Sequence, residues 1–88
     1  MKEQILSAIT DFVKTLQTLF KIGAANFVEE NFPKLVNNFW DDSKTDEENL
    51  KEIKQVFDAN KKLNNAVGNT EVSKIIEVFQ QGWLDKIV

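Results

Sequence analysis

The residue types that most often carry chemistry in proteins are missing from this chain. It contains no histidine, cysteine, tyrosine or arginine, so its reactive groups are carboxylates, lysine amines, hydroxyls and amides. The missing types supply many metal ligands, nucleophiles, proton carriers at neutral pH and bidentate phosphate clamps. The sequence therefore predicts no catalytic residue, no metal site and no cofactor, and it favours a protein that is not an enzyme.

The segment 41–52 comes closest to a metal-binding pattern. Four oxygen-bearing residues occupy positions that carry ligands in a calcium-binding loop: Asp41, Ser43, Thr45 and Glu52. However, Asp46 stands where such a loop needs glycine, and Thr45 with Glu48 forms a capping box that starts a helix inside the segment. A capped loop is the favoured interpretation.

Composition argues against several classes of partner. The net charge is −3, and no segment is strongly basic, so the clustered cations that nucleic-acid binding needs are missing. The chain has three glycines, too widely spaced for a phosphate-binding loop. No apolar run approaches the roughly 20 residues that span a bilayer. The absence of cysteine is compatible with a reducing compartment. We expect a cytoplasmic protein that binds no nucleic acid.

Apolar residues recur at intervals of three and four along nearly the whole chain. This spacing predicts helices over residues 2–22, 26–41, 45–67 and 69–87. Gly23 and Gly68 are the expected C-terminal caps of the first and third helices, and Thr45 is the expected N-cap of the third. The predicted fold is all-α, an antiparallel four-helix bundle that forms a single domain over residues 1–88.

Pro33 lies deep in the second predicted helix. A proline there removes one backbone hydrogen bond and clashes with the carbonyl group four residues earlier. The second helix is therefore expected either to kink or to be split into two pieces near Pro33.

Asn60 and Asn64 are polar residues near the apolar stripe of the third helix. The first interpretation is that Asn60 is buried and fixes the helix register or bonds a neighbouring helix, with Asn64 near water at the helix end. The second is that they make polar contacts in a ligand cavity or on a partner surface.

Trp40, Trp83, Leu84 and Val88 form the candidate interaction surface. Leu84 and Val88 fall off the apolar stripe of the fourth helix, and Trp40 falls at the edge of the second stripe. Both tryptophans are also suited to packing the ends of the bundle. If they are exposed instead, these residues form a patch for a partner.

The leading functional hypothesis is a small non-enzymatic interaction module that acts through apolar helix faces. It covers a regulator, an inhibitor or immunity-type factor, and a self-assembling subunit, so the expected partner is another protein or a second copy. The alternative is a carrier of an apolar ligand or a helical protein that binds a membrane surface. Mixed charges on the polar face of the first helix disfavour the membrane version.

Overall fold

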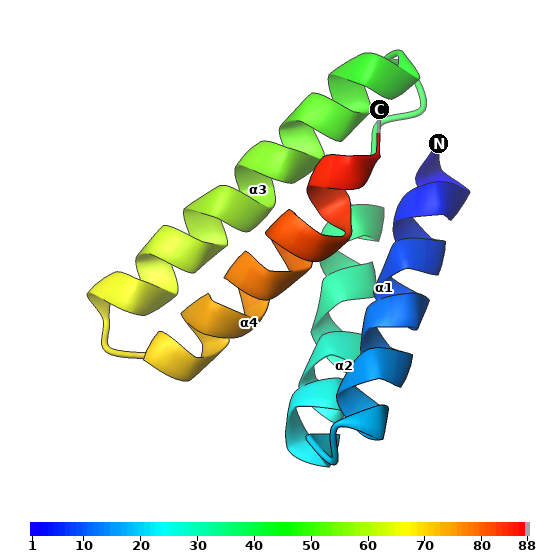
Figure 1. The fold of residues 1–88 in the computed structure, drawn as a ribbon. Coiled ribbons are helices and arrows are strands. Elements are labelled where there is room, and N and C mark those ends of the chain that lie inside the picture. The colour runs from blue at the N-terminus through cyan, green and yellow to red at the C-terminus, as the bar shows by residue number, and fades with distance from the viewer. Residues whose placement is uncertain (88) are drawn as a thin grey trace.

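The computed structural model describes residues 1–87 and contains four α-helices followed by a short 3₁₀ helix (Figure 1). The helices are α1 (Lys2–Thr18), α2 (Ile22–Phe39), α3 (Asp46–Ala66) and α4 (Thr70–Gly82), and η1 spans Leu84–Lys86. No strand occurs among these residues. The prediction of an all-α fold is confirmed.

The helices pack as two pairs. α1 packs along α2 and α3 packs along α4, while α2 also contacts α3. Three residues separate the helices within each pair, and six separate α2 from α3. In Figure 1 the two pairs diverge, so that the α1–α2 turn and the α3–α4 turn lie apart at the lower side of the molecule. This pairing fits a helical bundle.

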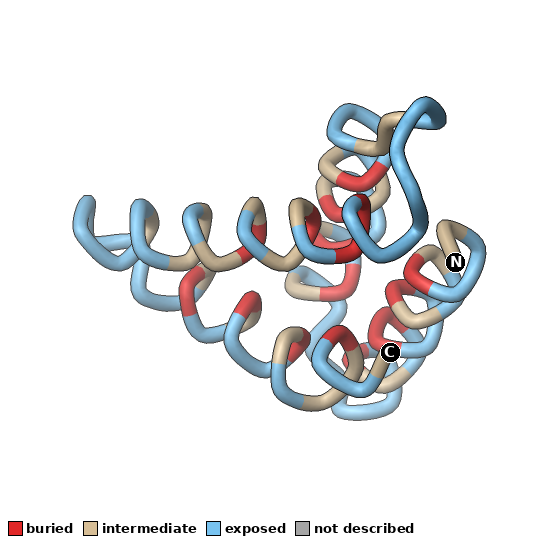
Figure 2. Tube along the Cα trace, turned by 90° about the horizontal axis from the view of Figure 1, so that it is seen from above, coloured by how far each residue is buried: buried red, intermediate tan, exposed pale blue. Residues whose placement is uncertain are grey.

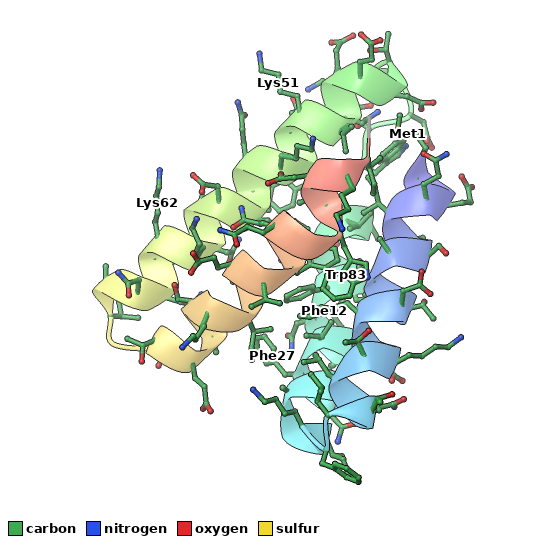
Figure 3. The ribbon with its side chains drawn as sticks, viewed as in Figure 1. Met1, Phe12, Phe27, Lys51, Lys62 and Trp83 are labelled. Atoms are coloured by element: carbon green, nitrogen blue, oxygen red, sulfur yellow. The ribbon has the colours of Figure 1, made fainter. Side chains whose placement is uncertain are left out.

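One phenylalanine from each helix forms the centre of the core. Phe12, Phe32, Phe57 and Phe79 are all at most 1 % exposed. The ring centroid of Phe79 lies 5.4, 5.2 and 5.3 Å from those of Phe12, Phe32 and Phe57, respectively. Trp83 extends this cluster, with its ring centroid 4.7 Å from that of Phe12 (Figure 3). Such aromatic pairs add about 0.5–1.5 kcal/mol each beyond the burial of their surface.

Burial is concentrated where the two pairs meet. Figure 2 shows buried positions along the inner sides of the helices, whereas the α3–α4 turn is exposed. Leu63 and Val67, which fit the apolar stripe of the third helix, are 62 % and 64 % exposed. The last turns of α3 extend beyond the core, so helical periodicity alone places too many residues inside it.

The first helix is shorter than predicted, and Gly23 is not its cap. α1 ends at Thr18, and Phe20 adopts a left-handed backbone conformation with φ of 61°. The N–H of Phe20 donates to the carbonyl of Gln17 at 3.1 Å, and the N–H of Lys21 donates to that of Leu16 at 2.9 Å. These two bonds form a Schellman motif in which Phe20 occupies the usual glycine position.

Gly23 lies inside α2, because this helix begins earlier than predicted. The early start places Ala25 inside the helix, where it is fully buried together with Val28. The favourable burial of these side chains opposes the strain at Phe20.

The second helix runs without interruption through Pro33, so of the two predicted alternatives, a kink or a split, the split is wrong. Phe32 and Val36 are both buried on either side of the proline. Burial therefore holds both halves of α2 on the core, although Pro33 donates no backbone hydrogen bond.

The predicted signals at both ends of the third helix are confirmed. Thr45 and Glu48 form the reciprocal capping box at the start of α3. At the other end, Gly68 has φ of 87°, and the N–H of Asn69 donates to the carbonyl of Asn64 at 2.8 Å. The fourth helix ends at Gly82, short of the predicted Ile87, and the chain continues into η1.

Replacing Phe20 with glycine should raise the free energy of unfolding by about 1 kcal/mol, because glycine adopts a positive φ without steric cost. Urea unfolding followed by tryptophan fluorescence measures this difference. Gly68→Ala is the matched opposite: a Cβ there meets nothing within 4 Å, but the φ of 87° is strained for alanine. It should lower the free energy of unfolding by about 1 kcal/mol. An unchanged or reduced stability of the Phe20 variant would show that the left-handed turn carries no strain.

Candidate functional site

The described members of the predicted surface, Trp40, Trp83 and Leu84, do not form one exposed patch. Leu84 is 0 % exposed, so its expected place on a surface is wrong. Trp40 and Trp83 are half-buried and pack against the core. Val88 lies outside the described residues. Leu84 enters the core because the fourth helix ends at Gly82 and η1 turns the side chain inward.

Asn60 and Asn64 are half-buried, and their side chains bond their own helix. The amide nitrogen of Asn60 donates to the carbonyl of Val56 at 2.9 Å, and that of Asn64 donates to the carbonyl of Asn60 at 2.7 Å. Within residues 1–87, neither side chain bonds a neighbouring helix, except that Asn64 accepts a 3.4 Å bond from Asn69 beyond the turn. Both asparagines line an open groove between α2 and the far half of the α3–α4 pair.

Among the described residues, the most exposed large apolar side chain is that of Phe20, at the α1–α2 turn, and two further exposed apolar residues lie beside it in the sequence. Leu19, Phe20 and Ile22 are 59 %, 90 % and 60 % exposed, and we call these three residues the apolar tip. Lys21 is the charged residue within this stretch and is also exposed. An exposed apolar cluster of this kind marks an interaction site more often than scattered single residues do.

The sequence analysis missed the apolar tip because Leu19 and Phe20 fit the apolar spacing of a helix predicted over residues 2–22, with Gly23 as its cap. The feature of the sequence that could have revealed the tip is that apolar residues continue up to the turn. Phenylalanine is disfavoured in the left-handed conformation, so local propensity gives no reason to end the helix there.

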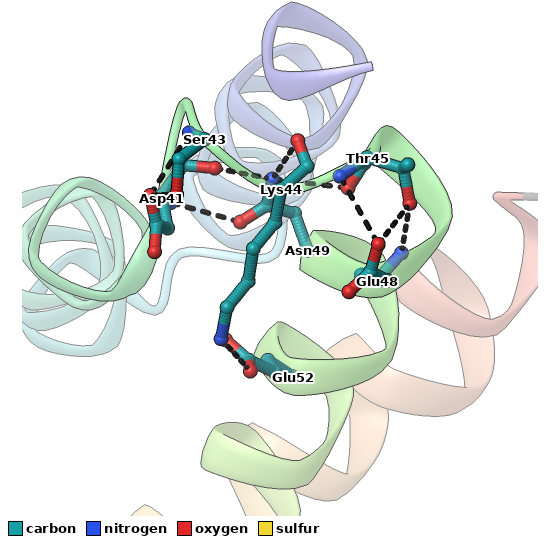
Figure 4. Close-up of polar contacts among 7 residues, drawn as sticks. All are labelled: Asp41, Ser43, Lys44, Thr45, Glu48, Asn49 and Glu52. Carbon is teal, nitrogen blue, oxygen red and sulfur yellow. Dashed lines mark hydrogen bonds and ion pairs between the residues drawn. The ribbon is translucent and has the colours of Figure 1, made fainter.

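Asn49 is the fully buried polar residue that holds the α2–α3 loop (Figure 4). Its Oδ1 accepts a hydrogen bond from the N–H of Asp41 at 2.8 Å, and its Nδ2 donates to the carbonyl of Asp41 at 2.8 Å. Nδ2 also donates to the carbonyl of Thr45 at 3.1 Å. The amide thus pairs with both backbone groups of one loop residue, which stabilises the connection between the two helical pairs.

Two charged side chains of this loop, those of Asp41 and Lys44, bond other residues of the segment 41–52. Asp41 accepts hydrogen bonds from the N–H and hydroxyl of Ser43, and these bonds lower the pKa of the Asp41 carboxyl. Lys44 pairs with Glu52, which raises the pKa of the Lys44 amine. Because α3 begins at Asp46, the segment 41–52 does not adopt the calcium-loop conformation.

A second open groove lies between α3 and α4 and is lined by polar side chains. Its charged residues include Lys51, Lys54, Asp58 and Asp85. Asp58 forms ion pairs with Lys61 at 3.4 Å and Lys62 at 3.0 Å, and the hydrogen bond from Lys62 lowers the pKa of the Asp58 carboxyl. A carboxylate whose pKa is lowered by two lysines is a poor general acid at neutral pH.

Residues 1–87 contain no cluster of acidic side chains arranged to hold a metal ion. Within the same range, no helix has both the length and the apolar character needed to cross a bilayer. Comparison with known proteins found no matching family, no matching curated protein and no matching solved structure. The geometry of the chain is therefore the basis for its functional interpretation.

Replacing Asn49 with alanine should lower the free energy of unfolding by about 2 kcal/mol, because the backbone N–H and carbonyl of Asp41 lose their partner. Urea unfolding measures the loss. Asn65→Ala is the matched control, since Asn65 is exposed on the same helix. Equal stability of the two variants would contradict the role assigned to Asn49.

Replacing Ser43 with alanine should raise the pKa of the Asp41 carboxyl toward its ordinary value, because the hydroxyl bond that favours the carboxylate is lost. Since the pKa is lowered in the folded protein, the bond stabilises the fold above the ordinary pKa of aspartate. This contribution is lost as the pH falls through the lowered value. Carboxyl NMR titration of both proteins measures the shift. An unchanged Asp41 pKa in the variant would contradict this cause.

Proposed function

We propose that this protein is a small non-enzymatic interaction module whose apolar tip binds a hydrophobic pocket on a protein partner. The observation that carries the proposal is the exposure of Leu19, Phe20 and Ile22 together on one tight turn. A turn of three residues between two packed helices is a rigid support for these side chains. A partner would gain affinity from burying them at little cost in ordering.

The backbone conformation of Phe20 supports the same interpretation. A left-handed conformation costs a non-glycine residue about 1–2 kcal/mol, and an exposed aromatic ring recovers little of this by packing within the monomer. Strained backbone often accompanies functional positions. Glycine would serve the turn better, so the large apolar ring is explained by a contact made outside the monomer.

The proposal rests on a bundle in which the two helices of each pair run antiparallel. Connections of three residues support this direction, because so short a link returns the chain beside the preceding helix. We also infer a bend of α2 at Pro33, where the missing N–H leaves the carbonyl of Glu29 without its helical donor.

The alternative function is binding to a membrane surface through the same tip. Aromatic and aliphatic side chains next to Lys21 suit the interface of a bilayer. The net charge of −3 opposes binding to anionic lipids, so we favour a protein partner. A carrier function is less well supported, because four closely packed phenylalanine rings occupy the centre of the core.

The test combines Phe20→Gly with photo-crosslinking. A benzophenone side chain at position 22 should crosslink a partner in an extract of the source cells, and excess unlabelled protein should prevent this. Excess Phe20→Gly protein should compete about tenfold less well, because it lacks the aromatic ring. Since this variant is expected to gain stability, loss of binding cannot be attributed to unfolding.

Position 63 is the matched control for the crosslinker, because Leu63 is similarly exposed on the other pair of helices. Equal crosslinking from positions 22 and 63, or equal competition by the two proteins, would contradict the proposal. Light scattering across a range of concentrations measures the mass of the protein in solution. An oligomer that forms with the unaltered protein but not with Phe20→Gly would identify a second copy as the partner. Sedimentation of the protein with anionic vesicles would instead support the membrane alternative.

A further inference from the structure

The open groove that contains Asn60 and Asn64 combines an apolar floor with amide side chains. It has a volume of about 340 Å³ and lies between α2 and the far half of the α3–α4 pair. The apolar side chains are Phe27, Phe32, Leu35, Val72 and Ile76. Figure 3 shows Phe27 below Phe12 and Trp83, in the space between α2 and α4. Among the described residues that line it, Lys34 alone carries a charge. We call this site the asparagine groove.

Three of its amides are held in one orientation by their own helices. Asn31, Asn60 and Asn64 each donate Nδ2 to the carbonyl one turn earlier, at 2.8, 2.9 and 2.7 Å. A carbonyl only accepts hydrogen bonds, so the nitrogen of each amide must face it. Each Nδ2 retains a second hydrogen. Within residues 1–87, the Oδ1 atoms of Asn31 and Asn60 accept no hydrogen bond.

Asn49 shows what such a helix-anchored amide does when a peptide lies against it. Its Nδ2 bonds the carbonyl of Thr45, also four residues earlier, at 3.1 Å. Its Oδ1 also accepts a hydrogen bond from the N–H of Asp41, and its Nδ2 donates to the carbonyl of Asp41, both at 2.8 Å. Asp41 follows Trp40, which has an extended backbone. Asn60 has the same anchor as Asn49, but its remaining donor and acceptor are unused within the described residues.

The spacing of Asn60 and Asn64 matches the repeat of an extended chain. Residues four apart on a helix are separated by about 6 Å along its axis. In an extended peptide, alternate residues are about 6.5 Å apart and direct their N–H and carbonyl groups to the same side. The two amides can therefore pair with two alternate residues of one peptide.

We propose that the asparagine groove binds an extended, largely uncharged peptide segment of a partner protein, through backbone pairing with Asn60 and Asn64 and apolar side chains on the floor. A helical segment fits these amides less well, because its backbone groups already bond one another. The low charge of the lining disfavours an ionic ligand. This site is separate from the apolar tip.

The test begins by selecting binders from displayed random linear peptides of about ten residues, the upper length of a typical strand. Enriched peptides should carry apolar residues at alternate positions. Asn60→Ala combined with Asn64→Ala should weaken their binding about tenfold or more, because two backbone-pairing groups are lost. Asn65→Ala should leave binding unchanged, since Asn65 is exposed on the same helix and does not line the groove.

Peptides with methylated backbone nitrogens test the pairing on the unaltered protein. Methylation of the two N–H groups that face the asparagines should weaken binding about tenfold or more, whereas methylation of the intervening residue should have little effect. This comparison holds even if the double variant is destabilised, which thermal unfolding would reveal. Loss of binding in both experiments supports the proposal.

Three results would overturn the proposal. The selection could enrich no peptides, the affinity could be unchanged both in the double variant and on N-methylation, or the bound peptide could be helical. Phe20→Gly should bind the selected peptides normally. The peptide site and the proposed function of the apolar tip can therefore fail independently.

Discussion

The contact of four phenylalanine rings fixes how the four helices are arranged. Each helix contributes one ring, and Phe79 lies within 5.4 Å, centroid to centroid, of the other three. A chain of this size has little apolar surface to bury, so large aromatic side chains supply much of the available stabilisation. The helices must approach one another where these rings meet.

This constraint leaves the far ends of the helical pairs free for other contacts. The pairs diverge from the aromatic cluster, so the last turns of α3 and the α1–α2 turn lie beyond the core. The apolar tip and the asparagine groove both result from this divergence. The two proposed interaction sites, one a projecting turn and one a groove with amides, are thus compatible with the same small core.

Asparagine occupies two different settings in this fold. Asn49 is fully buried and pairs with a backbone segment of its own chain, which connects the two helical pairs. Asn60 has the same bond to its own helix and lies in an open groove. A primary amide suits the buried role of Asn49 and the proposed role of Asn60, because it donates and accepts hydrogen bonds without the cost of burying a charge.

The helical character of the chain, the capping box at Thr45 and the glycine turn at Gly68 could all be predicted from the sequence, because these signals act between residues close in sequence. The sequence also indicated Asn60 and Asn64 as polar residues of interest, but not the groove that they line. The tertiary structure decided where α1 ends, how α2 continues through Pro33, that Leu84 is buried and that Phe20 is exposed. In these cases the burial of residues distant in sequence outweighs a local preference, which no pattern within one helix reports.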